Sequence, residues 1–189
     1  EDYKEYKATR QEQPEEIKVA IPYCLKIVEG FNIPILMMDR FEADDLIGTI
    51  AKKASAEGFK VYMMTPDKDF AQLVDENIFL FKPRRMGNGI DIMGIPEVLE
   101  RFDIDKVDQV RDVLGLKGDA VDNIPGIPGI GDKTASKLLK EYGSVEEIVK
   151  NADQLKGALQ KRVQEFGQQG IMSKELATIK IDSPIEFDE

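Results

Sequence analysis

Histidine is absent from this 189-residue sequence. Its absence excludes a Ser-His-Asp triad, a Cys-His nucleophile pair, a histidine zinc ligand and a histidine general base. Any catalysis must therefore use carboxylates, lysines, hydroxyl groups or bound metal.

Cysteine is scarce, and long apolar runs and excess positive charge are lacking. The single cysteine, Cys24, cannot form an intrachain disulfide, and no apolar run approaches the roughly 18 residues that a membrane span requires. We therefore expect a reducing, cytoplasmic setting and no membrane partner. The 26 Lys and Arg residues face 36 Asp and Glu residues, which gives a net charge of −10. This balance argues against coating nucleic acid through bulk charge, but local basic patches could still bind it.

The first segments read as a polar stretch followed by an amphipathic helix. Residues 1–13 are charged, with tyrosines interleaved. Apolar residues at helical spacing then predict a helix over residues 15–30, with Pro14 at its first position and Pro22 bending it near its start. Cys24 lies on the apolar face, so we expect it in the core.

A strand–helix–strand pattern follows. Residues 33–38 and 60–65 have the composition of short buried strands, and residues 42–57 that of the helix between them, which predicts a βαβ unit and a parallel sheet. Two further strands, 78–81 and 90–93, flank a turn-rich segment and predict a β-hairpin.

Beyond Pro96 the pattern is helical to the end. The length suits about one domain, or a compact domain with a smaller appendage. We therefore divide the chain into an α/β part, residues 1–95, and a helical part, residues 96–189.

Acidic residues gather at three points of this predicted fold. Two groups follow predicted strands, at the sheet edge where open α/β folds build ligand sites. If all three converge, such a cluster cannot stay ionised without cations, and ligands that are all oxygen suit Mg²⁺ or Mn²⁺ rather than zinc. The groups are Glu42, Asp44 and Asp45; Asp67 and Asp69; and Asp119 and Asp122.

Each group also has a purely structural explanation. Acidic residues at a helix start are favoured by capping and by the helix dipole, which covers Glu42, Asp44 and Asp45. Pro-Asp turns are common, and Asp119 and Asp122 could belong to a solvated loop. Three such groups in this order favour the metal site.

Residues 126–139 have the form of a helix-hairpin-helix. Glycines allow the backbone to approach a phosphate, and the N–H groups at the following helix start point towards that anion. Such contacts bind the sugar-phosphate backbone without reading bases. The alternative is an ordinary interhelical turn with lysines on the solvent side. The predicted DNA contacts are Gly126, Gly129, Gly131, Lys133, Thr134 and Lys137.

Basic residues near the start form a weaker signal. Lys4, Lys7 and Arg10, interleaved with Tyr3 and Tyr6, could clamp and stack single-stranded nucleic acid, or they could form a solvated charged helix.

These motifs together resemble a known family. Glu42-Ala43-Asp44-Asp45, Thr65-Pro66-Asp67-Lys68-Asp69, the run from Gly118 to Gly126 and the adjoining hairpin are similar to the 5′ nuclease domain at the amino end of bacterial DNA polymerase I. That domain belongs to the flap endonuclease superfamily. Tyr6-Lys7-Ala8-Thr9-Arg10 resembles the basic segment of its helical arch, so residues 1–13 would be a remnant of that arch.

The resemblance implies a fold and an activity. The fold is a PIN-like parallel sheet flanked by helices, followed by an all-helical subdomain with the helix-hairpin-helix. The activity is structure-specific 5′-3′ exonuclease and 5′-flap endonuclease cleavage of DNA or RNA at a flap or nicked duplex, in RNA primer removal and DNA repair. A polymerase domain would be attached in the same parent chain.

The resemblance also implies roles for the residues. Glu42, Asp44 and Asp45 would hold one of two metal ions, Asp119 and Asp122 the second, and Asp67 and Asp69 would lie between them. Lys7 and Arg10 would steer or polarise the phosphate. The hairpin would anchor duplex DNA around a K⁺ ion held by backbone carbonyls.

One departure from the family pattern leads to two expectations. The family pattern begins upstream with a strand that ends in Asp-Gly and a second strand with another aspartate, which this sequence does not show. We therefore expect a truncated nuclease that binds metal weakly and cuts poorly or not at all, with a bare sheet edge through which it could dimerise. The main alternative is a non-catalytic duplex-binding module. A nucleotide-binding regulator is disfavoured because no Gly-rich phosphate loop follows the first predicted strand.

Overall fold

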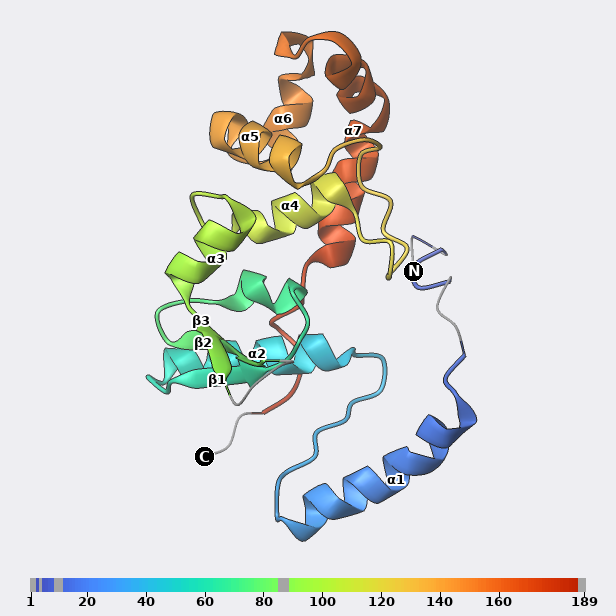
Figure 1. Ribbon diagram of the computed structural model, residues 1–189, viewed down its shortest axis with the longest axis vertical. Coiled ribbons are helices and arrows are strands. Elements are labelled where there is room, and N and C mark those ends of the chain that lie inside the picture. The colour runs from blue at the N-terminus through green and yellow to red at the C-terminus, as the bar shows by residue number, and fades with distance from the viewer. Residues whose placement is uncertain (1–2, 4, 9–11, 85–88, 187–189) are drawn as a thin grey trace.

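The computed structural model describes residues 3, 5–8, 12–84 and 89–186, and an α/β part precedes a helical part, as the sequence predicts (Figure 1). The strands are β1 (Val61–Met64), β2 (Ile78–Pro83) and β3 (Ile90–Met93). The helices are α1 (Glu15–Gly30), α2 (Ala43–Ala56), α3 (Ile95–Phe102), α4 (Gln109–Lys117), α5 (Asp132–Tyr142), α6 (Val145–Lys150) and α7 (Gly157–Ala177), with the short 3-10 helices η1 (Asp69–Leu73) and η2 (Ala152–Gln154).

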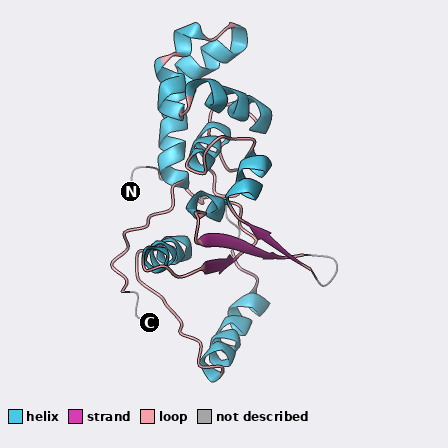
Figure 2. Cartoon of the chain, turned by 90° about the vertical axis from the view of Figure 1, so that its left-hand side faces the viewer, coloured by secondary structure: helices cyan, strands magenta, loops and turns pink. Residues whose placement is uncertain are grey.

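The sheet has the strand order β1-β2-β3. β1 and β2 are parallel, with Val61 opposite Ile78, and η1 lies in the connection between them. β2 and β3 are antiparallel, which confirms the predicted hairpin; residues 85–88 of its turn lie outside the described residues. Alternate residues of β2, Ile78 and Leu80, are buried, and α2 packs beside the sheet (Figure 2).

The first predicted strand is wrong, and with it the βαβ unit. Residues 33–38 have no regular secondary structure, and Ile33, Leu36 and Met37 are exposed. Apolar composition suits a buried strand, but a strand persists only where a neighbour pairs its backbone N–H and C=O groups. In the described chain no strand lies beside residues 33–38, and β1 pairs on one edge only.

The helix over residues 15–30 forms as α1, but its apolar face is not in the core. None of its residues is buried, and Cys24 is exposed, which corrects the core assignment. Pro14 is the N-cap rather than the first helical residue, and the helix continues through Pro22. Figures 1 and 2 show α1 lying apart from the sheet. Helical spacing identifies a face that can be buried, whereas burial itself needs an element to pack against it.

α4 lies at the centre of the helical part, where α7 packs along it. Gly115 permits the close approach, because a Cβ atom there would lie 2.6 Å from Cβ of Lys174. Lys174 in turn places its Nζ 2.6 Å from Oδ1 of Asp112, which is only 6% exposed. This ion pair fixes α7 against α4.

After α7 the chain returns to the α/β part. The backbone N–H of Ile179 donates to Gln72, and that of Ser183 donates to Thr49 on α2, at 3.0 and 3.1 Å. The last described segment therefore ties the two parts together. Over the described residues, no helix combines the length and the apolar character needed to cross a bilayer.

Candidate metal and nucleic-acid site

The turn after β1 carries Asp67 and Asp69. Oγ1 of Thr65 accepts from the backbone N–H of Asp67 at 3.1 Å, and Oδ1 of Asp67 accepts from the N–H of Asp69 at 3.0 Å. These local bonds fix the turn, so both carboxylates lie beyond the carboxyl end of β1.

The loop after α4 brings Asp119 and Asp122 to the same place. Gly118, with φ of +76°, turns the chain out of α4, and Asp119 and Ile124 then exchange two backbone hydrogen bonds of 2.9 and 2.7 Å. Two of the three predicted acidic groups therefore meet. Their cleft is lined by Pro66, Asp67, Lys68, Asp69, Arg101, Asp119, Val121 and Asp122.

Lys68 neutralises Asp119 within this cleft. Its Nζ lies 2.5 Å from Oδ2 of Asp119, which is 9% exposed. Burial by itself raises the pKa of Asp119, but the ion pair with Lys68 and the N–H of Val121 outweigh it and lower that pKa. Asp119 is thus ionised and compensated.

Asp69 has no such compensation. Burial, followed by the negative charge of Asp67, raises the pKa of Asp69 to about 6, although Lys68 acts in the opposite direction. Its Oδ1 is buried and finds no hydrogen-bond partner among the described residues. A buried acceptor without a donor is costly, and a cation would satisfy it.

The third acidic group begins α2, and its members differ. Asp45 caps the start of α2, because its Oδ2 accepts from the backbone N–H of Glu42 at 3.4 Å. Its Oδ1 accepts from the backbone N–H of Lys180 at 2.9 Å. Asp44 is half-buried, and burial, together with the charges of Glu42 and Asp45, raises its pKa.

Lys7 joins this group to the cleft. Its Nζ forms an ion pair with Glu42, and its backbone N–H donates to the carbonyl of Asp122 at 2.9 Å. Nζ also lies 4.7 Å from the ring centroid of Tyr6. Arg10, the other predicted basic residue of this segment, lies outside the described residues.

The donors of the cleft suit a divalent cation in their chemistry. All are oxygens, as Mg²⁺ and Mn²⁺ prefer, and the unsatisfied oxygen of Asp69 is the deficit that a cation would correct. Across the described residues, however, no three acidic side chains are grouped closely enough to hold an ion. A cation here would be held by fewer than three of these carboxylates and by water, as Mg²⁺ commonly is, unless the side chains move closer together.

The hairpin adjoins the cleft along the chain and leads into α5. Gly126 has φ of +60°, and a Cβ atom there would lie 2.4 Å from the backbone N of Gly118, so the two turns pack backbone against backbone. Gly131 is the N-cap of α5 and accepts from the N–H groups of Thr134 and Ala135. Lys133 and Lys137 are exposed on the first turns of α5. The glycine turn thus leads directly into α5, with these two lysines on its solvent side.

Comparison with known proteins agrees with this arrangement. The sequence model of the 5′-3′ exonuclease N-terminal, resolvase-like domain matches residues 1–103. The model of the 5′-3′ exonuclease C-terminal SAM fold matches residues 106–189. The chain belongs to the 5′-3′ exonuclease family. The fold class expected from the sequence, an α/β sheet part followed by a helical part, is thereby confirmed.

Two relatives and one solved structure illustrate the match. This exonuclease-family chain is 40% identical over 185 residues to DNA polymerase I of Bacillus subtilis, covering 97% of the chain but 21% of the relative. It is 37% identical over 187 residues to the 5′-3′ exonuclease of Aquifex aeolicus, covering 99% of the chain and 62% of the relative. A bacteriophage T5 flap endonuclease, solved as a pseudo-enzyme-product complex with DNA and metal ions, has a TM-score of 0.73 at 22% identity, covering 92% of this chain and 66% of that one.

Three basic side chains of this exonuclease-family chain escaped the sequence analysis. Lys68 and Arg101 line the acidic cleft, and Arg162 of α7 reaches the hairpin. Lys68 lies between the predicted ligands Asp67 and Asp69 in the sequence, so its position at the acidic cleft could have been predicted. Arg101 and Arg162 are single charged residues on amphipathic helices, and only the fold places them.

Proposed function

We propose that the chain is a metal-dependent 5′ nuclease that acts on DNA with a 5′ flap or a nick, including the ends of RNA primers, and that its activity by itself is impaired. The observation that carries the proposal is the uncompensated Asp69, which shares one cleft with Asp67, Asp119 and Asp122 next to a glycine hairpin. Such a cleft provides cation-binding oxygens, and the hairpin provides backbone N–H groups for phosphate.

Mg²⁺ or Mn²⁺ would be held on two sides of Lys7. Asp67, Asp69, Asp119 and Asp122 form one side, and Glu42 and Asp44, with Asp45 behind them as the helix cap, form the other. Bound there, the cations would lower the pKa of a water molecule and stabilise charge on the phosphate.

The chain's basic residues would orient the phosphate. Arg101 lines the cleft, and Lys7 lies between Glu42 and Asp122. Arg10 would act with them from the same segment as Lys7. These cations offset the negative field of the carboxylates, which would otherwise repel the substrate.

The hairpin would hold the duplex beside the cleft. The exposed Lys133 and Lys137 and the backbone N–H groups of the first residues of α5 suit phosphate, with Gly126, Gly129, Gly131 and Thr134 shaping the turn. The K⁺ implied by the family fits less well, because Gln169 and Arg162 of α7 already donate to the carbonyls of Gly126 and Gly129. No step here depends on it.

Cleavage of a fluorescent 5′-flap duplex, assayed with Mg²⁺, Mn²⁺ or EDTA, tests the proposal. Asp67→Asn and Asp69→Asn should abolish metal-dependent cleavage and leave duplex affinity intact. Asp182→Asn, which removes the same charge from an exposed position, should leave cleavage unchanged.

The second candidate, a non-catalytic duplex-binding module, is favoured by the absence of a ready cation-binding group among the described residues. Duplex binding that persists in EDTA, with no cleavage at any metal concentration, would establish the module and overturn the nuclease.

The relatives suggest the setting of this activity. The chain spans about a fifth of its DNA polymerase I relative, so we propose that a polymerase domain accompanies it, in the cytoplasm. The free edge of β1, where Tyr62 and Met64 are exposed, would pair with a second copy of the chain. Light scattering that shows a monomer at high concentration would reject the dimer.

A further inference from the structure

Arg162 belongs to α7, which is distant in sequence from the glycine turn, and its side chain reaches that turn. Its Nη1 is 3.4 Å from the carbonyl oxygen of Gly129, and a Cβ atom on Gly129 would come within 2.3 Å of that nitrogen. Gly129 has φ of +78°, a backbone conformation that favours glycine. The guanidinium thus rests directly on the turn while remaining exposed to solvent.

The hairpin does not need Arg162 for its own support. The N–H of Gly126 donates to Oγ of Ser173 at 3.0 Å, and Nε2 of Gln169 donates to the carbonyl of Gly126 at 2.6 Å. Both partners lie on α7, so the turn is already fixed to that helix by two shorter bonds. A long, exposed bond from Arg162 adds little to this anchor.

Among the described residues, no carboxylate forms an ion pair with Arg162, in contrast to nearby lysines. Lys117 is paired with Asp132, with Nζ–Oδ distances of 2.7 and 3.0 Å, and Lys140 is paired with Asp103. One bond to a neutral carbonyl leaves most of the five N–H donors of Arg162 available.

We propose that Arg162 is a further DNA-binding residue, which extends the phosphate grip of the hairpin from α5 onto α7. The planar guanidinium would bind a backbone phosphate of duplex DNA next to the one held by the start of α5. The contact carries no base information, so it strengthens binding to every sequence equally. This inference rests on the duplex-binding part of the proposed function and is independent of cleavage.

The test compares Arg162→Ala with wild type in EDTA, by fluorescence anisotropy with blunt duplexes of about 20 base pairs. Losing one charge-assisted phosphate contact should weaken binding roughly tenfold at low salt. It should also lower the slope of log K against log salt by about 1, equally for unrelated sequences.

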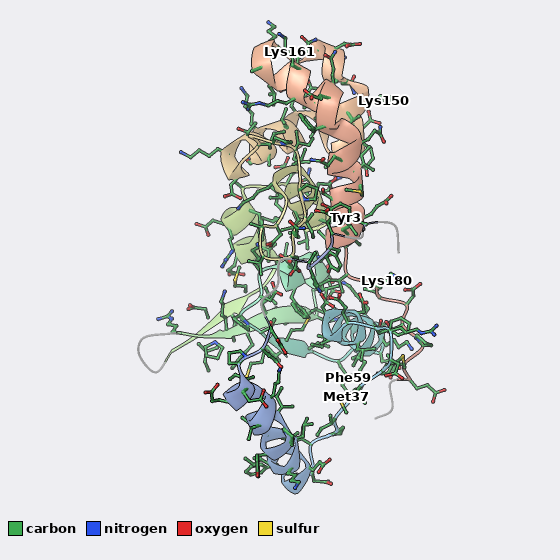
Figure 3. All side chains as sticks on the ribbon, turned by 90° about the vertical axis from the view of Figure 1, so that its right-hand side faces the viewer. Tyr3, Met37, Phe59, Lys150, Lys161 and Lys180 are labelled. Carbon is green, nitrogen blue, oxygen red and sulfur yellow. The ribbon has the colours of Figure 1, made fainter. Side chains whose placement is uncertain are left out.

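Lys161→Ala is the matched control. Lys161 is the preceding exposed residue of the same helix, at the end of the helical part (Figure 3), and in the described chain it has no hydrogen bond or ion pair. It should change affinity less than twofold and leave the salt slope within error. Arg162→Lys should retain the wild-type salt slope, since it keeps the charge.

Each outcome decides the question. A tenfold loss for Arg162→Ala with an unchanged unfolding midpoint supports the proposal. Equal effects of Arg162→Ala and Lys161→Ala overturn it, because bulk charge would then explain both. Loss of affinity that follows a lowered unfolding midpoint overturns it as well, in favour of a structural role. Wild-type chain that binds no duplex rejects both this inference and the duplex-binding function.

Discussion

Asp69→Asn should make the metal-free chain more stable at neutral pH. Raising the pKa of Asp69 from 3.8 to about 6 corresponds to about 3 kcal/mol of lost stability once the carboxylate is ionised. Because the side chain is half-buried, solvent screens part of that charge, and we expect a gain of about 1–3 kcal/mol. For a chain of this size the midpoint should rise by roughly 3–10 °C.

The pH dependence identifies the cause. The folded chain binds the proton of Asp69 more tightly than the unfolded chain does, so wild-type stability falls as the pH rises from about 4 to about 6 and stays low above that. Asp69→Asn lacks this loss. The difference between the two proteins should therefore be largest at pH 7.5 and shrink towards pH 4.

Urea unfolding followed by circular dichroism measures both effects in EDTA, with Asp182→Asn as the control for net charge. Added Mn²⁺ should then stabilise the wild type, by about 2.7 kcal/mol at a hundred times its Kd, and should stabilise Asp69→Asn less. If Asp69→Asn is no more stable than Asp182→Asn at pH 7.5, Asp69 is not the strained carboxylate that the structure indicates.

Two further stability predictions concern close packing. Lys174→Ala should lower the free energy of unfolding by about 3–5 kcal/mol, because it removes the ammonium group that neutralises the buried carboxylate of Asp112 and leaves that carboxylate with the N–H of Val145. Urea titration measures this change, and a loss below about 1 kcal/mol would contradict it. Gly126→Ala should destabilise the hairpin by about 2 kcal/mol or more and abolish duplex binding, since its Cβ atom would strike the backbone of Gly118. Gly30→Ala, at the end of α1, where a Cβ atom would meet nothing within 4 Å, should stay close to wild type in both assays.

Local sequence patterns predicted the elements whose structure depends mainly on residues nearby in the sequence. The antiparallel hairpin needs only its two neighbouring strands, and the glycine turn before α5 takes positive φ at Gly126 and Gly129, which glycine adopts without strain. Both follow from residue types at fixed spacing.

The failures share one physical cause. Residues 33–38 and the apolar face of α1 have the composition of buried elements, but burial depends on a partner surface that local spacing cannot supply. Cys24 was misplaced for the same reason. The side-chain partners of Arg101 and Arg162 depend on contacts between segments far apart in sequence, so no local pattern could reveal them.

The acidic residues differ in how their negative charge is balanced, and this difference determines which of them a cation would bind first. Glu42 has the ammonium of Lys7, Asp119 has that of Lys68, and Asp45 has two backbone N–H groups. Asp69 alone of these four has a buried oxygen with no partner among the described residues. An arriving cation therefore gains most at Asp69, where it satisfies that oxygen, and least at Asp119, where it must compete with Lys68. We expect metal binding to begin beside Asp69, whereas coordination through Oδ2 of Asp119 would compete with the ion pair between Asp119 and Lys68.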